Sequence, residues 1–303
     1  MKRAGVVAIV AGAVVLAGVV IGIVSLSTNA AGPEEAAQSY LSALAAGDGE
    51  SAAELIVDSP RNESELAAAL DTAASLITSP EVLGVESSDA AATATFTFLL
   101  EGENVEGTLS LVETDDGWGL TPDALGVIVP TAQQGDSVMA AGTLVLSAAT
   151  VVLLPAVYSV SAAPVDLLEG TVTARVTPGS TVGVSAPAEV SAEAIVAVQE
   201  QLDSYADSCA ASVDDVPNEC GIRVPWGVDL ASLDRIAFEI SSYPAVEISD
   251  DGGSFRSSGG VIVATATGTT RNGETQSFTY RSDDWAMQGT VQFIGNEMVL
   301  SVF

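Results

Sequence analysis

The stretch Ala92–Leu99, ATATFTFL, decides the fold that we expect for the first half of this chain. Side chains alternate between the two faces of an extended strand. Phe96 and Phe98 therefore share one face, and the threonines occupy the other. A sheet that has one buried side and one exposed side shows this pattern. The sequence predicts such a sheet here.

Three helices are expected before this strand. Pro33 fits the first turn of a helix, and the two glutamates that follow it suit the positive end of the helix dipole. Apolar residues then recur at helical spacing until Gly47 ends the helix. Asp48 can cap a second helix, ESAAELIV, and a third, SELAAALDTAASLI, ends before Pro80.

After this strand the alternating pattern continues. Val105–Val112 and Trp118–Leu120 are expected strands, as is Val82–Val85 before it. The turns between them fall at 101–104 and 115–117. Residues 33–128 are therefore predicted to form an α+β domain, in which three helices precede a meander of antiparallel strands.

The opening of this domain carries a recognisable motif. Residues 37–48 read AQSYLSALAAGD, which has the form A-x-x-Y-L-x-A-L-x-x-G-D, and Trp118 follows in a late strand after an acidic turn. In these features the chain resembles the NTF2-like superfamily, especially the small domains that follow an anchor in bacterial envelope proteins. The resemblance implies an NTF2-like cone of three helices and an antiparallel sheet. It implies no single function, because the family includes enzymes, binding modules and structural domains.

The segment before this domain is apolar. Residues 4–26, AGVVAIVAGAVVLAGVVIGIVSL, carry no charge and follow Lys2 and Arg3. About 20 apolar residues span a bilayer core. The sequence predicts a transmembrane signal-anchor at 4–26 in the lipid bilayer, with a cytoplasmic tail at 1–3, a linker at 27–32 and the remainder outside. A signal peptide cleaved near Ala30 is the alternative.

The composition restricts the chemistry of the chain. It has 40 acidic residues against 9 lysines and arginines, for a net charge of −31, and it has no histidine. This charge repels nucleic acid and attracts cations or basic peptides, so no nucleic-acid partner is expected. The lack of histidine excludes Ser-His-Asp and Cys-His catalysis and histidine metal sites. We expect no catalytic residues, no cofactor and no metal site.

Residues 131–190 contain a long uncharged run. The segment Ser137–Pro164 could be a second membrane span or a buried β module. Serine and threonine interrupt the apolar residues, and Asp136 and Asp166 flank the run, which favours the small β module. Pro155 lies between two runs rich in β-branched residues, as at a corner that joins two strands.

Residues 191–303 are predicted to form a second α+β domain. Ser191 can cap a helix. Apolar residues follow it at helical spacing, and the expected buried stripe is Ile195, Val198, Leu202, Tyr205 and Cys209. Six strands are expected after the helix: 235–240, 245–248, 260–267, 276–280, 287–293 and 297–302. Asn272-Gly273 is a strong signal for a hairpin turn.

Cys209 and Cys220 are the only cysteines of the chain. Outside the cytoplasm such a pair is typical of a disulfide, which we expect here. A redox site would more often show a C-x-x-C motif, and a zinc site would need two further ligands. The entropy of closing a loop of this size corresponds to about 3 kcal/mol of stabilisation.

Several residues are weaker candidates for binding. Pairs of adjacent acids could hold a hard cation, although we expect them to lie in turns that are exposed to water. These pairs are Asp115/Asp116, Asp214/Asp215, Asp250/Asp251 and Asp283/Asp284. Trp226 could stack on a ligand or close the edge of a core. Arg223 and Arg235 are each expected to pair with a nearby carboxylate, because cations are scarce here.

These features favour a non-enzymatic protein of a Gram-positive cell envelope, held in the cell membrane by a single pass. It would bind a cell-wall component or a protein partner on the outer side. The helix, the cysteine pair and the strands of the last domain are similar to the tails of actinobacterial envelope proteins, which implies location more than activity. One alternative is a small-ligand carrier or enzyme that uses the NTF2-like pocket. A second is a structural or regulatory subunit of a membrane complex.

Overall fold

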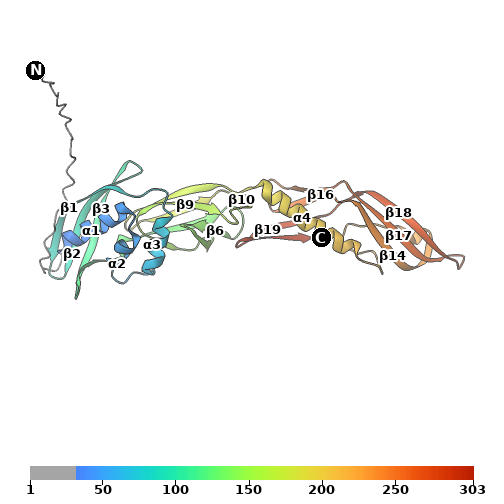
Figure 1. Ribbon diagram of the computed structural model, residues 1–303, viewed down its shortest axis with the longest axis horizontal. Coiled ribbons are helices and arrows are strands. Elements are labelled where there is room, and N and C mark those ends of the chain that lie inside the picture. Colours follow the sequence, from blue (N-terminus) through green and yellow to red (C-terminus); the bar gives the residue numbers. More distant parts are fainter. Residues whose placement is uncertain (1–31) are drawn as a thin grey trace, which may run out of the picture. The chain divides into compact units, whose positions relative to one another are not determined.

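The computed structural model describes residues 32–303 (Figure 1). About half of these residues, 50%, lie in strands, and 20% lie in helices. The strands form mostly antiparallel sheets. The predicted α+β class is therefore wrong: the fold is mainly antiparallel β. The helices of the first domain are short and the strands after them are many, so the helices do not form a layer of comparable size.

Two further parts of the predicted architecture need correction. No NTF2-like cone is identifiable in the structure. The predicted anchor at 4–26 lies outside the described residues. Within residues 32–303, no helix combines the length and the apolar character needed to cross a membrane.

The first segment has the predicted order of helices and strands, but its third helix ends at Asp71 and not at Ile77 as predicted. Three α-helices and a short 3-10 helix occur, and they are α1 (Pro33–Ala46), α2 (Gly49–Glu54), α3 (Glu63–Asp71) and η1 (Pro122–Ala124). The strands pair in sequence order, and they are β1 (Thr78–Ser88), β2 (Ala91–Leu100), β3 (Glu103–Thr114) and β4 (Gly117–Leu120). Gly47 ends α1 in the left-handed conformation, with φ of 73°, as predicted.

The apolar face of β2 packs toward the helices. Phe96 and Phe98 are 1% exposed, and their rings stack with centroids 5.3 Å apart. Tyr40 of α1 is fully buried, and its hydroxyl donates to the Ala124 carbonyl at 2.7 Å. Tyr40 is therefore a packing residue in the core of this segment.

The middle segment consists of strands, including the uncharged run. Its strands are β5 (Gly126–Ala132), β6 (Ser137–Ala140), β7 (Thr143–Leu146), β8 (Val151–Leu153), β9 (Ala156–Ala162), β10 (Leu168–Glu169), β11 (Thr171–Val176), β12 (Thr181–Ala186) and β13 (Glu189–Val190). One sheet has the order β11-β9-β6-β7, and another has the order β12-β5-β8. Pro155 stands between β8 and β9, which belong to different sheets. The predicted corner is confirmed.

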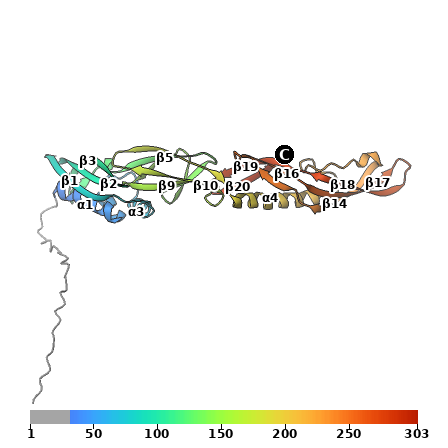
Figure 2. The ribbon, with the colours of Figure 1, turned by 90° about the horizontal axis from the view of Figure 1, so that it is seen from above.

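The last segment begins with α4 (Ala192–Ala210), which Ser191 caps by accepting from the Ala194 amide. A 3-10 helix and seven strands follow: η2 (Trp226–Val228), β14 (Leu230–Ser242), β15 (Ala245–Ile248), β16 (Ser254–Ser258), β17 (Gly260–Thr270), β18 (Thr275–Trp285), β19 (Gln288–Ile294) and β20 (Glu297–Val302). They form two sheets, β14-β17-β18 and β15-β16-β19-β20. α4 runs along these strands (Figure 2).

The buried face of α4 differs from the predicted stripe at two positions. Val198, Leu202 and Cys209 are buried as expected, but Ile195 is 44% exposed and Tyr205 is only half-buried. Ala194 and Ala206 are buried, so small residues complete the contact with the sheet.

Candidate binding pocket

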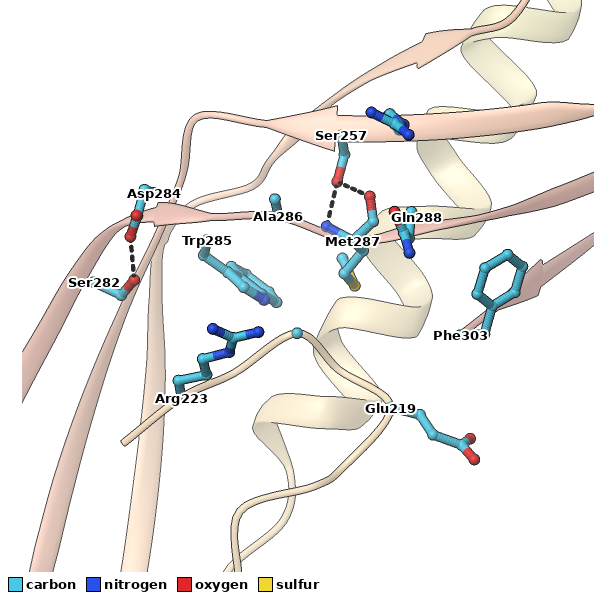
Figure 3. Close-up of a pocket in the computed structure, with 12 residues that line it drawn as sticks. Glu219, Arg223, Ser257, Ser282, Asp284, Trp285, Ala286, Met287, Gln288 and Phe303 are labelled. Atoms are coloured by element: carbon cyan, nitrogen blue, oxygen red, sulfur yellow. Dashed lines mark hydrogen bonds between the residues drawn. The ribbon is translucent and has the colours of Figure 1, made fainter. Parts of the chain in front are cut away.

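A pocket of about 610 Å³ lies where the cysteine loop meets the two sheets of the last segment. Figure 3 shows the residues that line it. They come from four separate parts of the sequence: Glu219, Gly221, Arg223, Arg256, Ser257, Ser282, Asp284, Trp285, Ala286, Met287, Gln288 and Phe303.

The disulfide holds one wall of this pocket. Cys209, at the end of α4, is bonded to Cys220, with their Cα atoms 5.9 Å apart, and the predicted disulfide is confirmed. The Trp285 indole, 2% exposed, donates through Nε1 to the Cys220 carbonyl at 2.7 Å. The loop that follows α4 is therefore fixed both covalently and by a buried hydrogen bond.

Ser257 fixes the opposite wall. Its hydroxyl accepts from the Met287 amide at 2.9 Å and donates to the Met287 carbonyl at 3.2 Å. Both residues are buried. The short link between β18 and β19, residues 286–287, is thus held against β16, with Trp285 directly before it and Gln288 directly after it.

Gly221 allows the loop to approach this link closely. Its φ is +63°, a backbone conformation that residues other than glycine rarely adopt. A Cβ atom at this position would lie 2.1 Å from the Ala286 carbonyl oxygen. No flexible side chain could move aside, because the neighbouring atom belongs to the backbone. The shape of the pocket therefore depends on glycine at this position.

We expect Gly221→Ala to lower the free energy of unfolding by more than about 2 kcal/mol, because a left-handed alanine alone costs about 1–2 kcal/mol and the clash adds to it. Gly295→Ala is the matched control, since φ is +58° there and nothing lies within 4 Å of the added Cβ. Urea denaturation of both variants measures the difference. Equal losses would show that the contact with Ala286 has no energetic weight.

Two arginines line this pocket and have no carboxylate partner among residues 32–303. Ion pairs within residues 32–303 join Arg61 to Glu65, Arg175 to Glu101 and Glu103, and Arg281 to Asp283. Arg223 and Arg256 are exposed and are in none of them. The prediction that Arg223 and Arg235 would each pair with a carboxylate is wrong, because no acid side chain in the described part of the chain lies within 4.0 Å of either guanidinium.

The acids of the pocket are directed elsewhere. Asp284 accepts a hydrogen bond from the Ser282 hydroxyl at 2.9 Å. In Figure 3 the Glu219 carboxylate points away from Arg223 and Trp285. The guanidinium groups therefore remain available to an acidic group of a ligand.

The other sequence candidates do not assemble into a site. No group of three or more acids or cysteines within residues 32–303 could hold a metal ion. Asp283 and Asp284 lie in β18 rather than in a turn, whereas Asp115 and Asp116 form the turn between β3 and β4. Trp226 is half-buried and packs against a small second core around Leu230 and Ile236, so it closes a core edge.

Burial and hydrogen bonds shift the pKa of several side chains in residues 32–303, and these shifts do not indicate acid–base catalysis. Burial raises the pKa of Tyr40 well above its ordinary value, and it also raises the pKa of Tyr158. Both phenols therefore stay protonated at neutral pH and donate to backbone carbonyls. Hydrogen bonds from Ser51 lower the pKa of Asp48, and Arg175 lowers that of Glu103, so these carboxyls are ionised.

The signals for this pocket in the sequence are weak. Arg223 is notable only as one of the few cations, and no sequence pattern marks Trp285 or Arg256. Comparison of the chain with protein-family models, with curated proteins and with solved structures finds no match.

Proposed function

We propose that this chain is a non-enzymatic binding protein of the cell envelope, anchored through residues 4–26 with its folded part outside. It binds an acidic group of a cell-wall component or of a partner protein in the pocket between Arg223 and Arg256. One observation carries the proposal: two of the few cations in a chain of net charge −31 line one pocket and have no carboxylate partner within the described residues.

The chemistry of the lining defines the ligand. Guanidinium groups bind carboxylates and phosphates through paired hydrogen bonds, which are stronger than bonds between neutral groups. Phe303, 67% exposed, adds apolar surface beside them. A ligand that combines an acidic group with an apolar part fits this lining. The negative field of the whole chain repels free anions, so these local contacts have to supply the affinity.

The disulfide supports an extracytoplasmic location. It is buried at both cysteines, which are 4% and 5% exposed, and no free cysteine is present in residues 32–303. Such bonds form and persist in oxidising compartments. This agrees with the orientation that Lys2 and Arg3 predict for the anchor.

The test is retention of the full chain on purified, protein-free Gram-positive cell walls and, in a parallel arm, on solubilised membrane proteins. We expect the double variant Arg223→Ala, Arg256→Ala to lose retention by about tenfold or more, because charge-assisted bonds contribute about 1.5–3 kcal/mol each. Walls stripped of phosphate polymers separate carboxylate ligands from phosphate ligands.

The matched control is the double variant Arg235→Ala, Arg271→Ala. It makes the same change in net charge with arginines outside the pocket. Equal loss in the two double variants would mean that only net charge matters, and equal retention of both with the native chain would place binding elsewhere. Either result would overturn the assignment of this pocket.

A further inference from the structure

The strand β20 has a free edge beside a groove. It is the last strand of the sheet β15-β16-β19-β20, and β19 is its only partner among the strands that the structure describes. A groove of about 620 Å³ lies between this strand and α4. Ala197, Glu200, Gln201 and Tyr205 of α4 and Leu300 and Val302 of β20 line it.

The backbone groups of β20 that face the groove can be assigned from the pairing. The Phe303 amide donates to the Gln288 carbonyl at 3.1 Å, toward β19. In an antiparallel pair, successive residues of an edge strand point their backbone groups alternately toward the partner and away from it. Met298, Leu300 and Val302 therefore direct their amides and carbonyls outward.

One of these outward groups already has a substitute partner. The Gln201 side chain donates through Nε2 to the Met298 carbonyl at 3.3 Å. An added strand would supply a backbone amide at the same place. No hydrogen bond within residues 32–303 joins the outward groups of Leu300 and Val302 to another element. The edge is thus open along the part that lines the groove.

The edges at β15, β1 and β14 are less suited to pairing. At the opposite edge of the same sheet, the Val246 amide of β15 already donates a hydrogen bond to Gln199 Oε1 at 2.9 Å. The edge strands β1 and β14 contain register shifts, which bend a strand and interrupt its ladder. β20 pairs with β19 from Glu297 to Val302 without a shift. It therefore offers a regular template.

The charge around this edge selects the partner. Glu200 is exposed in the groove, and Glu297 is exposed at the start of β20. A second copy of this chain would bring another net charge of −31 to the same place, which opposes self-association. A segment with lysine or arginine complements these acids.

We propose that β20 binds an extended basic segment of a partner protein, which adds to the sheet as a new edge strand. Its backbone pairs with Leu300 and Val302, alternate apolar side chains enter the groove against α4, and a basic side chain lies near Glu200. Recognition of this type takes affinity from backbone hydrogen bonds and specificity from side-chain pockets. This site is separate from the arginine pocket and goes beyond the function proposed above.

The probe is a fluorescent peptide in which valine alternates with lysine and threonine, titrated into the full chain. We expect Leu300→Pro to weaken binding about tenfold, since it removes one outward amide and leaves the peptide carbonyl unpaired. Proline is tolerated where the amide faces away from the sheet. Leu300→Ala is the control, because it shortens the side chain and keeps the amide. Equal weakening by both variants would overturn the backbone pairing.

A second variant tests the proposal even if Leu300→Pro does not fold. Glu200 is exposed, so Glu200→Lys leaves the fold intact. We expect it to weaken the basic peptide about fivefold at low salt and to favour the same peptide with glutamate in place of lysine. Unchanged preference would overturn the charge assignment. If sedimentation showed a dimer that forms through this edge, the partner would be a second copy of the chain. That result would overturn the proposal of a basic segment. Wall retention in the arginine assay is expected to stay unchanged in both variants.

Discussion

Replacing both bridging cysteines, Cys209→Ser with Cys220→Ser, is expected to lower the free energy of unfolding by about 3 kcal/mol. The bond closes a loop with a sequence separation of 11 residues and restricts the unfolded chain. The two cysteines are 4% and 5% exposed, so the variant would also bury two serine hydroxyls in place of the disulfide. Urea denaturation of the full chain measures the loss.

The same bond is expected to matter for the pocket. The Cys220 carbonyl accepts the hydrogen bond from the Trp285 indole. Gly221 and Arg223 lie in the same loop just after it. Once the loop is released, Arg223 loses its fixed position relative to Arg256. The double serine variant should therefore also lose wall retention.

A reductant provides the control. It should destabilise the native chain to the level of the double serine variant and leave that variant unchanged. Equal stability of the native chain with and without reductant would show that the bond has no constraining role.

Local structure could be predicted from the sequence where one residue type has a clear physical role. Gly47 ends α1 in the left-handed conformation, Ser191 caps α4, and Asn272-Gly273 joins β17 to β18. The alternation at Phe96 and Phe98 gave the buried face of β2. In each case the cause lies within a few residues of its effect.

The fold class could not be predicted in the same way. The strand β16 was missed because its sequence, SFRSS, places Phe255 and Ser257 on the buried face. Ser257 is polar but satisfied by Met287, so the apolar alternation that marks a strand is absent. Missing such strands, and giving short helices the weight of a layer, led to the α+β expectation.

The pocket was out of reach for a related reason. Arg256 enters it because β16 pairs with β19, with Arg256 opposite Gln288. Arg223 enters it because the disulfide and Gly221 bring its loop to Ala286. The scarcity of cations led us to expect ion pairs, but pairing depends on which strands are neighbours, and the sequence does not give that.

Trp285→Ala is expected to have the largest effect on stability, a loss of about 4 kcal/mol in the free energy of unfolding, because truncating a buried aromatic side chain leaves a cavity. Trp285 is 2% exposed, and its indole bonds to the Cys220 carbonyl, which the variant leaves buried and unpaired. Trp285→Phe keeps most of the volume and removes only the hydrogen bond, so its loss should be about 1–2 kcal/mol.

Trp226→Ala separates this effect from the general loss of an aromatic residue. Trp226 is only half-buried and packs at the edge of the small second core, so we expect a smaller loss there. A loss from Trp285→Ala no greater than that from Trp226→Ala would contradict the central position of Trp285. The indole joins the disulfide loop to the β18–β19 link, so its truncation should also lower wall retention, whereas Trp226→Ala should leave retention intact. That contrast tests whether one buried residue supports both the stability of the last segment and the shape of its pocket.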